Sequence, residues 1–170
     1  MKKLLCGLLA AGVLVLFLLP RSSGNSGMDT RSLSSTLGVD VRAGTVLEES
    51  DTHGGFHGDG LTYTALSFAG NSLSGQLSSS WSPLPLSPHL TSLAYGSGTA
   101  AIRSGPYLTD GNGAPVLPAV ENGYYYFYDR HDRAEDPRDE SAVMGRSSFN
   151  LTLALYDTDT DMLYYVEYDT

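Results

Sequence analysis

Apolar and polar residues alternate most regularly near the end of the chain. Residues 149–156 read FNLTLALY, so that phenylalanine or leucine occupies every second position from 149 to 155. A period of two predicts a β-strand with one apolar face. The segment DTDTD at 157–161 is typical of a turn, and we expect residues 162–169 to return beside the first strand as a hairpin.

Three earlier segments are rich in β-branched and aromatic residues, which favour strands. They are residues 39–49, residues 61–68 with the sequence LTYTALSF, and residues 124–129 with the sequence YYYFYD. Together with the C-terminal hairpin they predict a largely antiparallel sheet of about five strands.

Two short helices are predicted between the strands. Residues 71–80 place two leucines four positions apart, and residues 89–95 follow a serine and a proline that suit a helix start. Residues 139–145 are expected to form a helical turn. We therefore predict an α+β domain with two short helices on one face of the sheet, and an all-β sandwich or barrel is the alternative.

An apolar leader helix is predicted to precede this domain. Residues 1–21 contain two lysines and then sixteen uncharged residues at 4–19, which is typical of a signal peptide or an N-terminal membrane anchor. We expect the helix to be kept as an anchor, with the lysines on the cytoplasmic side. The alternative is cleavage after Gly24, which would release a secreted protein.

The rest of the chain divides into a linker and one domain. Residues 22–36 are rich in serine and glycine and predict a flexible linker, and we expect residues 37–170 to form a single extracytoplasmic globular domain. After residue 28 the chain has seven arginines, nineteen carboxylates and a formal charge of −12. Such a surface repels phosphate, so we expect no nucleic-acid partner. The single cysteine, Cys6, lies in the leader, so the domain has no disulfide.

The loop DTHGGFHGDG at 51–60 is the richest polar segment. His53, His57 and Asp59 lie within seven residues, among glycines that allow tight bends. Imidazoles and a carboxylate in one loop are able to hold a divalent metal or to act as an acid–base pair. The plain alternative is a hairpin loop made of turn-forming residues.

A second candidate follows the predicted strand 124–129. Asp129 and His131 belong to the segment DRHDR, and they would join the first loop if strands 61–68 and 124–129 were close. The two loops would then form a three-histidine site for a divalent metal. A charged surface turn is the alternative interpretation, in which the segment forms weak surface ion pairs.

Other sequence patterns mainly exclude classes of enzyme. The chain has no Gly-x-Ser-x-Gly motif and no phosphate-binding loop. Because the domain has neither lysine nor cysteine, Schiff-base chemistry and cysteine nucleophiles are excluded. The many tyrosines after residue 123 suit strand packing, or alternatively an aromatic binding surface.

Four strings carry a resemblance: DTHGGFHGDG, WSPLPLS, NGYYYFYDRH and YDTDTDMLYYVEYDT. Over roughly residues 37–170 the chain resembles a group of small, uncharacterised exported or membrane-anchored proteins of Gram-positive gut bacteria. The resemblance implies export but no activity, and it transfers no functional residue.

From these patterns we expect an extracytoplasmic domain that is membrane-tethered or secreted and acts as a non-enzymatic binding module. Its partners would be the membrane, through the N-terminal helix, and an unknown protein or small-molecule ligand. The alternative is a metal-dependent hydrolase that uses the site formed by the two loops.

Overall fold

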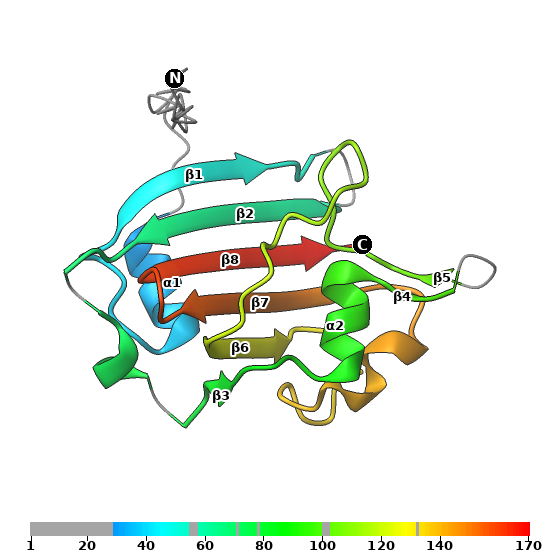
Figure 1. Ribbon diagram of the computed structural model, residues 1–170. Helices are drawn as coiled ribbons and strands as arrows, with labels where there is room; N and C mark the ends of the chain where they lie inside the picture. Colours follow the sequence, from blue (N-terminus) through cyan, green and yellow to red (C-terminus); the bar gives the residue numbers. More distant parts are fainter. Residues whose placement is uncertain (1–28, 55–57, 71, 78, 100–102, 132) are drawn as a thin grey trace, which may run out of the picture.

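A computed structural model describes residues 29–54, 58–70, 72–77, 79–99, 103–131 and 133–170. Its centre is a six-stranded antiparallel sheet of order β1-β2-β8-β7-β6-β3 (Figure 1). The strands are β1 (Thr45–Asp51), β2 (Gly60–Ser67), β3 (Ser82–Pro83), β6 (Gly123–Asp129), β7 (Asn150–Asp157) and β8 (Met162–Asp169). A separate small hairpin pairs β4 (Ser97–Gly98) with β5 (Arg103–Ser104).

The predicted α+β class and the largely antiparallel sheet are confirmed. Four predicted strands coincide with β2, β6, β7 and β8 to within one residue. The strand predicted at 39–49 begins only at Thr45, because Val39 and Val41 are buried in a loop that packs on the sheet rather than pairing with it. The additional strand is β3, which pairs with β6 over two residues.

The two α-helices lie on opposite faces of the sheet, and so do the two segments predicted as helices, so the prediction of two helices on one face is wrong. Helix α1 (Thr30–Leu37) contributes to the apolar cluster that contains Ala154 and Tyr156 of β7. Helix α2 (Pro88–Tyr95) contributes to the cluster with the alternate β7 residues, such as Leu153. Because successive side chains of a strand point to opposite faces, the helices cover different sides, as Figure 1 shows. The segments predicted as helices at 71–80 and 89–95 divide in the same way, because Leu73 belongs to the cluster of α1 and Leu90 to that of α2.

Local sequence explains both helices. In α2, the hydroxyl of Ser87 accepts a hydrogen bond from the backbone N–H of Leu90, as predicted. Helix α1 begins after Asp29, whose carboxylate caps it, and ends at Gly38 in the left-handed conformation. The prediction of a flexible linker is therefore wrong for residues 30–36, while residues 1–28 lie outside the described residues.

The remaining helical predictions have mixed outcomes. Residues 139–145 form the expected turn, the 3-10 helix η2 (Glu140–Gly145), which is capped by Asp139. Among the described residues of 71–80, the helical part is the short 3-10 helix η1 (Ser74–Gln76). There the backbone N–H of Leu73 donates to the hydroxyl of Tyr156 rather than to a preceding helical turn.

The face that carries α1 changes from apolar to polar along the strands. Two aligned rows of side chains cross β2, β8 and β7 on this face. The apolar row is Leu66, Leu163 and Tyr156, and the polar row is Thr62, Glu167 and Thr152. Helix α1 packs in the same cluster as the apolar row. The polar row therefore marks the part of this face where a site is able to form.

We expect Gly123→Ala to lower the free energy of unfolding by about 1 to 3 kcal/mol, the usual cost of overpacking. Gly123 has a φ of 151°, and an added Cβ would collide with the backbone carbonyl of Tyr156 in the neighbouring strand. Urea unfolding followed by the fluorescence of the buried Trp81 measures the change.

The matched control is Gly111→Ala, because an added Cβ at that turn position meets no atom within 4 Å. We expect its unfolding midpoint to stay close to that of the native chain. Equal stabilities of the two variants would contradict the close approach of β6 and β7 at Gly123.

Candidate functional site

His53 lies immediately beyond β1, with an acceptor at each ring nitrogen. Its Nδ1 lies 2.7 Å from Oδ1 of Asp51, and its Nε2 lies 3.2 Å from Oδ2 of Asp169 at the end of β8. The hydroxyl of Thr62 is 3.1 Å from the same Nδ1. The ring of His53 therefore joins the end of β1 to the end of β8.

A glycine makes this position possible. A Cβ at Gly60 would lie 2.5 Å from the backbone nitrogen and Cα of His53. The chain around His53 is held by two further hydrogen bonds, because the N–H of Leu61 donates to the hydroxyl of Thr52, which in turn donates to the Leu61 carbonyl. Gly60 thus allows a close approach of the chain to His53, as the sequence indicated for the glycines of this loop.

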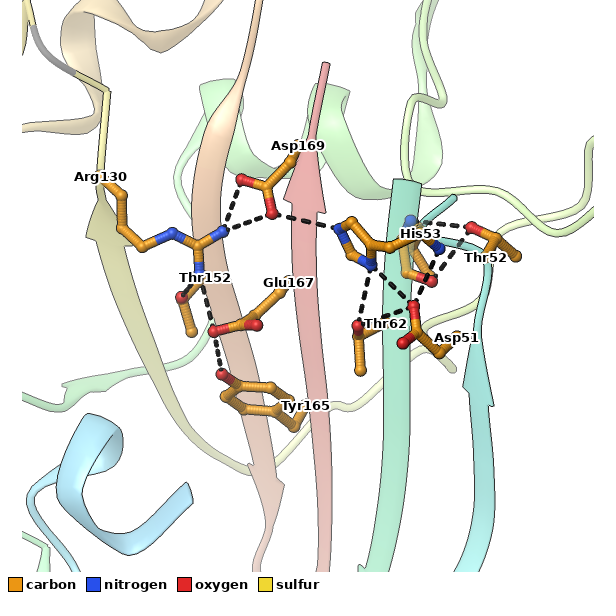
Figure 2. A network of polar contacts seen from close by, with 10 residues as sticks. Asp51, Thr52, His53, Thr62, Arg130, Thr152, Tyr165, Glu167 and Asp169 are labelled. Atoms are coloured by element: carbon orange, nitrogen blue, oxygen red, sulfur yellow. Dashed lines mark hydrogen bonds and ion pairs between the residues drawn. The ribbon is translucent and has the colours of Figure 1, made fainter. Parts of the chain in front are cut away.

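Arg130 joins the same carboxylate from the other side. Its Nη2 donates to both oxygens of Asp169, at 2.7 and 2.9 Å (Figure 2). Its Nη1 donates to Oγ1 of Thr152 at 3.1 Å and forms an ion pair with Oε1 of Glu167 at 2.7 Å. The same Glu167 oxygen accepts a hydrogen bond of 2.6 Å from the hydroxyl of Tyr165.

These contacts form one continuous group, which we call the polar network (Figure 2). It consists of Asp51, Thr52, His53, Thr62, Arg130, Thr152, Tyr165, Glu167 and Asp169. Thr62, Thr152 and Tyr165 are buried, whereas the side chains of His53, Arg130, Glu167 and Asp169 remain 23% to 29% exposed. The network is therefore anchored in the sheet and still reaches solvent.

Burial and charge shift the acidities within the network. Burial by itself would lower the pKa of Arg130, but the hydrogen bonds to Asp169 and the charge of Glu167 outweigh it and raise that pKa. Hydrogen bonds from the backbone and ring of His53 lower the pKa of Asp51. Burial, reinforced by the bond to Glu167, raises the pKa of Tyr165 far above its usual value. Arg130 and Asp51 are thus charged, and Tyr165 is a neutral hydrogen-bond donor, at neutral pH.

Asp129 does not belong to this network, although it directly precedes Arg130. It pairs with Leu151 on the face that α2 covers, and there its carboxylate is 2% exposed and bound by Arg146. A step of one residue along β6 changes the face, so the sheet separates Asp129 from His53. The predicted approach of these two residues is therefore wrong.

His131 has partners of its own. Its Nδ1 accepts a hydrogen bond from the backbone N–H of Arg133, and its Nε2 lies 3.1 Å from the hydroxyl of Ser148. With Nδ1 occupied as an acceptor, the neutral ring carries its proton on Nε2 and donates to Ser148. A ring in that tautomer is unable to take the proton of the serine, so this pair lacks the arrangement of a catalytic dyad.

The two remaining predicted site residues have separate outcomes. Asp59 is exposed, and its charge adds to burial and to Tyr107 in raising the pKa of Tyr168, which packs with the α2 face. His57 lies outside the described residues. Within the described ranges, no group of three histidine, cysteine, aspartate or glutamate residues is arranged to hold a metal ion.

Sequence reasoning missed Arg130, Thr152, Glu167 and Asp169. The sequence did contain a signal for these residues. In the predicted strands, threonine and acidic residues alternate with the leucines, tyrosines and valine from which the strands were predicted. Alternation indicates that these polar residues share a face within one strand. It does not indicate which strands are neighbours, and the network depends on that.

We expect Asp129→Asn to destabilise the protein by about 3 to 5 kcal/mol, because it leaves the guanidinium of Arg146 with no carboxylate in a buried position. Chemical unfolding measures the loss. The double variant Asp129→Asn with Arg146→Gln should recover part of the stability, since it removes both charges together.

Asp40→Asn is the matched control, since Asp40 pairs with Arg42 in an ion pair whose side chains are largely exposed. We expect no measurable change from it. If Asp129→Asn is as harmless as Asp40→Asn, then the burial of the Asp129 pair is contradicted.

Neither a search for membrane-spanning helices nor comparison with known proteins assigns a function to the polar network. Over the described part of the chain, no helix has both the length and the apolar character needed to cross a membrane. Comparison with protein-family models, curated proteins and solved structures finds no match to this chain. The functional argument therefore rests on the polar network and on the surface around it.

Proposed function

We propose that this chain is a non-enzymatic binding module that works outside the cytoplasm, with the polar network as its ligand-binding surface. One observation carries the proposal. Charged side chains from β8 and from residues next to β1 and β6 are fixed by hydrogen bonds on a rigid sheet, yet they remain about a quarter exposed. Groups held in this way keep their geometry when a ligand arrives, which limits the entropy cost of binding.

The charges of the network favour a cationic ligand. Asp51, Glu167 and Asp169 supply three carboxylates, against the one guanidinium of Arg130. Arg130 already donates to acceptors within the network, whereas the carboxylates accept more than one hydrogen bond per oxygen. The formal charge of −12 after residue 28 attracts cations to the whole domain. An ammonium or guanidinium group fits these properties.

No contact among the described residues favours the hydrolase alternative. The ring nitrogens of His53 face Asp51 and Asp169, and the hydroxyl that lies near them is that of Thr62, which is only 7% exposed and so is poorly placed to attack a substrate. Asp129 lies on the opposite face, and His131 donates to Ser148. We therefore propose binding rather than hydrolysis.

The location outside the cytoplasm is proposed from the leader alone. Sixteen uncharged residues at 4–19 follow two lysines, and such a segment partitions into lipid with its basic end on the cytoplasmic side. We propose a membrane anchor, with secretion after cleavage as the alternative. The acidic surface supports a partner other than nucleic acid.

The ligand proposal is tested with arginine amide, a small probe that carries both a guanidinium and an ammonium group. We expect it to bind the full-length chain in non-ionic detergent and to shift the NMR signals of residues 53, 130, 167 and 169. Glu167→Gln should weaken binding at least about tenfold, because it removes a charge but keeps the side-chain shape.

Glu121→Gln is the matched control, since it removes one exposed carboxylate away from the network. We expect its affinity to equal that of the native chain. Equal weakening by both variants, or signal shifts spread evenly over the acidic surface, would mean charge screening without a site and would contradict the proposal.

Export is tested separately, by adding a protease to intact cells that produce the full chain. We expect the domain to be digested at the cell surface, or to be found in the medium if the leader is cleaved. A domain that stays protected inside intact cells, but is digested after lysis, would refute the location.

A further inference from the structure

The two edges of the sheet are protected unequally. Strand β3 forms one edge with two residues, and Pro83 removes a backbone donor there (Figure 1). Strand β1 forms the other edge with seven residues, none of which is proline or lysine. Within the described residues, β2 is the sole strand that pairs with β1. A long edge without proline offers backbone N–H and C=O groups to another strand.

The side chains of β1 divide into an apolar end and an acidic end. A bulge between Val46 and Glu48 leaves Leu47 outside the pairing, and Val46 and Leu47 are 40% and 55% exposed. They are the exposed large hydrophobic residues of the described chain. Beyond the bulge, pairing with β2 is regular to Asp51, and Glu48, Glu49 and Asp51 carry negative charge on exposed positions.

These charges select the occupant. A second copy of β1 would bring its own three carboxylates to this edge, and like charges on neighbouring strands are destabilising. A strand that carries arginine or lysine at alternate positions would instead place opposite charges across the pair. An apolar residue at its end would cover Val46 and Leu47.

We propose that β1 is a docking edge for an extended basic segment of another polypeptide, which adds to the sheet as a further strand. Main-chain hydrogen bonds to β1 would supply affinity, and the acidic and apolar side chains would supply selectivity. This surface and the polar network share Asp51, but the other residues of β1 lie outside the network. The inference concerns a macromolecular partner and does not depend on the small-ligand proposal.

The test uses a capped peptide that alternates arginine with threonine and ends in two valines, added to the full-length chain in non-ionic detergent. We expect saturable binding, with the backbone amides of residues 45–51 gaining protection from hydrogen exchange. Glu49→Lys should weaken binding about fivefold, because Glu49 and Asp51 share one face of β1 and the cross-strand pair at Glu49 changes from opposite to like charge.

Two controls separate strand addition from general attraction. A peptide of equal charge with proline in place of each threonine is unable to form the ladder, and we expect it to bind far more weakly. Glu121→Lys makes the same charge change on an exposed residue outside β1, and its affinity for the arginine–threonine peptide should change little.

Equal binding of the two peptides would overturn the proposal, as would equal weakening by the two lysine variants. Self-association of the chain that is lost in Leu47→Asp, measured by analytical ultracentrifugation, would overturn it in favour of a second copy as the occupant. Binding of arginine amide at residues 53, 130, 167 and 169 would be unaffected by these outcomes, so a failure here is distinguishable from a failure of the ligand site.

Discussion

The pairing of β2 with β8 holds together parts of the chain that are remote in sequence. Eight residue pairs join the two strands without a shift, from Gly60 opposite Asp169 to Ser67 opposite Met162. Closing so large a loop costs chain entropy, which the hydrogen bonds and the apolar contacts on both faces offset. Without this pairing, the N-terminal hairpin β1–β2 would be separated from the C-terminal strands, and both the core and the polar network would be lost.

The same pairing determines which parts of each face of the sheet are covered and which parts carry exposed polar side chains. Both faces are packed with apolar side chains, but α2, η2 and the neighbouring loops cover one of them, while α1 shares a cluster with the apolar end of the other. Polar side chains that would be costly to bury under a helix lie at the far end of the α1 face and bind one another. Asp129 differs from these side chains, since it is buried on the α2 face, where its charge is paired with that of Arg146.

Acidic charge is used in two structural settings. In the polar network, carboxylates from β1 and β8 are held by His53 and Arg130, and their geometry is fixed by the strands. Along β1, carboxylates line an exposed edge that has no proline to block pairing. A rigid network suits a small cationic group, whereas an acidic edge suits an extended basic chain. The proposed small-ligand site and the proposed docking edge therefore both depend on the acidic surface, but the first uses carboxylates with a fixed geometry and the second uses carboxylates along an exposed strand.

The sequence by itself determined the local elements. Alternation located β7, and the turn-forming segment after it located β8 as the hairpin partner. A capping serine with proline located the start of α2, and the run of aromatic residues located β6. Asp29, Gly38 and the spacing of Leu33 and Leu37 also marked α1, but the high serine content of that segment was interpreted as a linker. These features are predictable because they depend on neighbours within a few residues.

Only the tertiary structure decided which of these elements meet. The network needs β8 between β2 and β7, so that Asp169 reaches both His53 and Arg130, and no local pattern specifies that strand order. The same order and the strict alternation of faces separate Asp129 from His53, although both are acid–base residues beside strand ends. The physical reason is that a strand can pair with several distant segments. Which pairing is the most stable depends on how well both faces of the whole sheet are buried, and no single segment's sequence determines this.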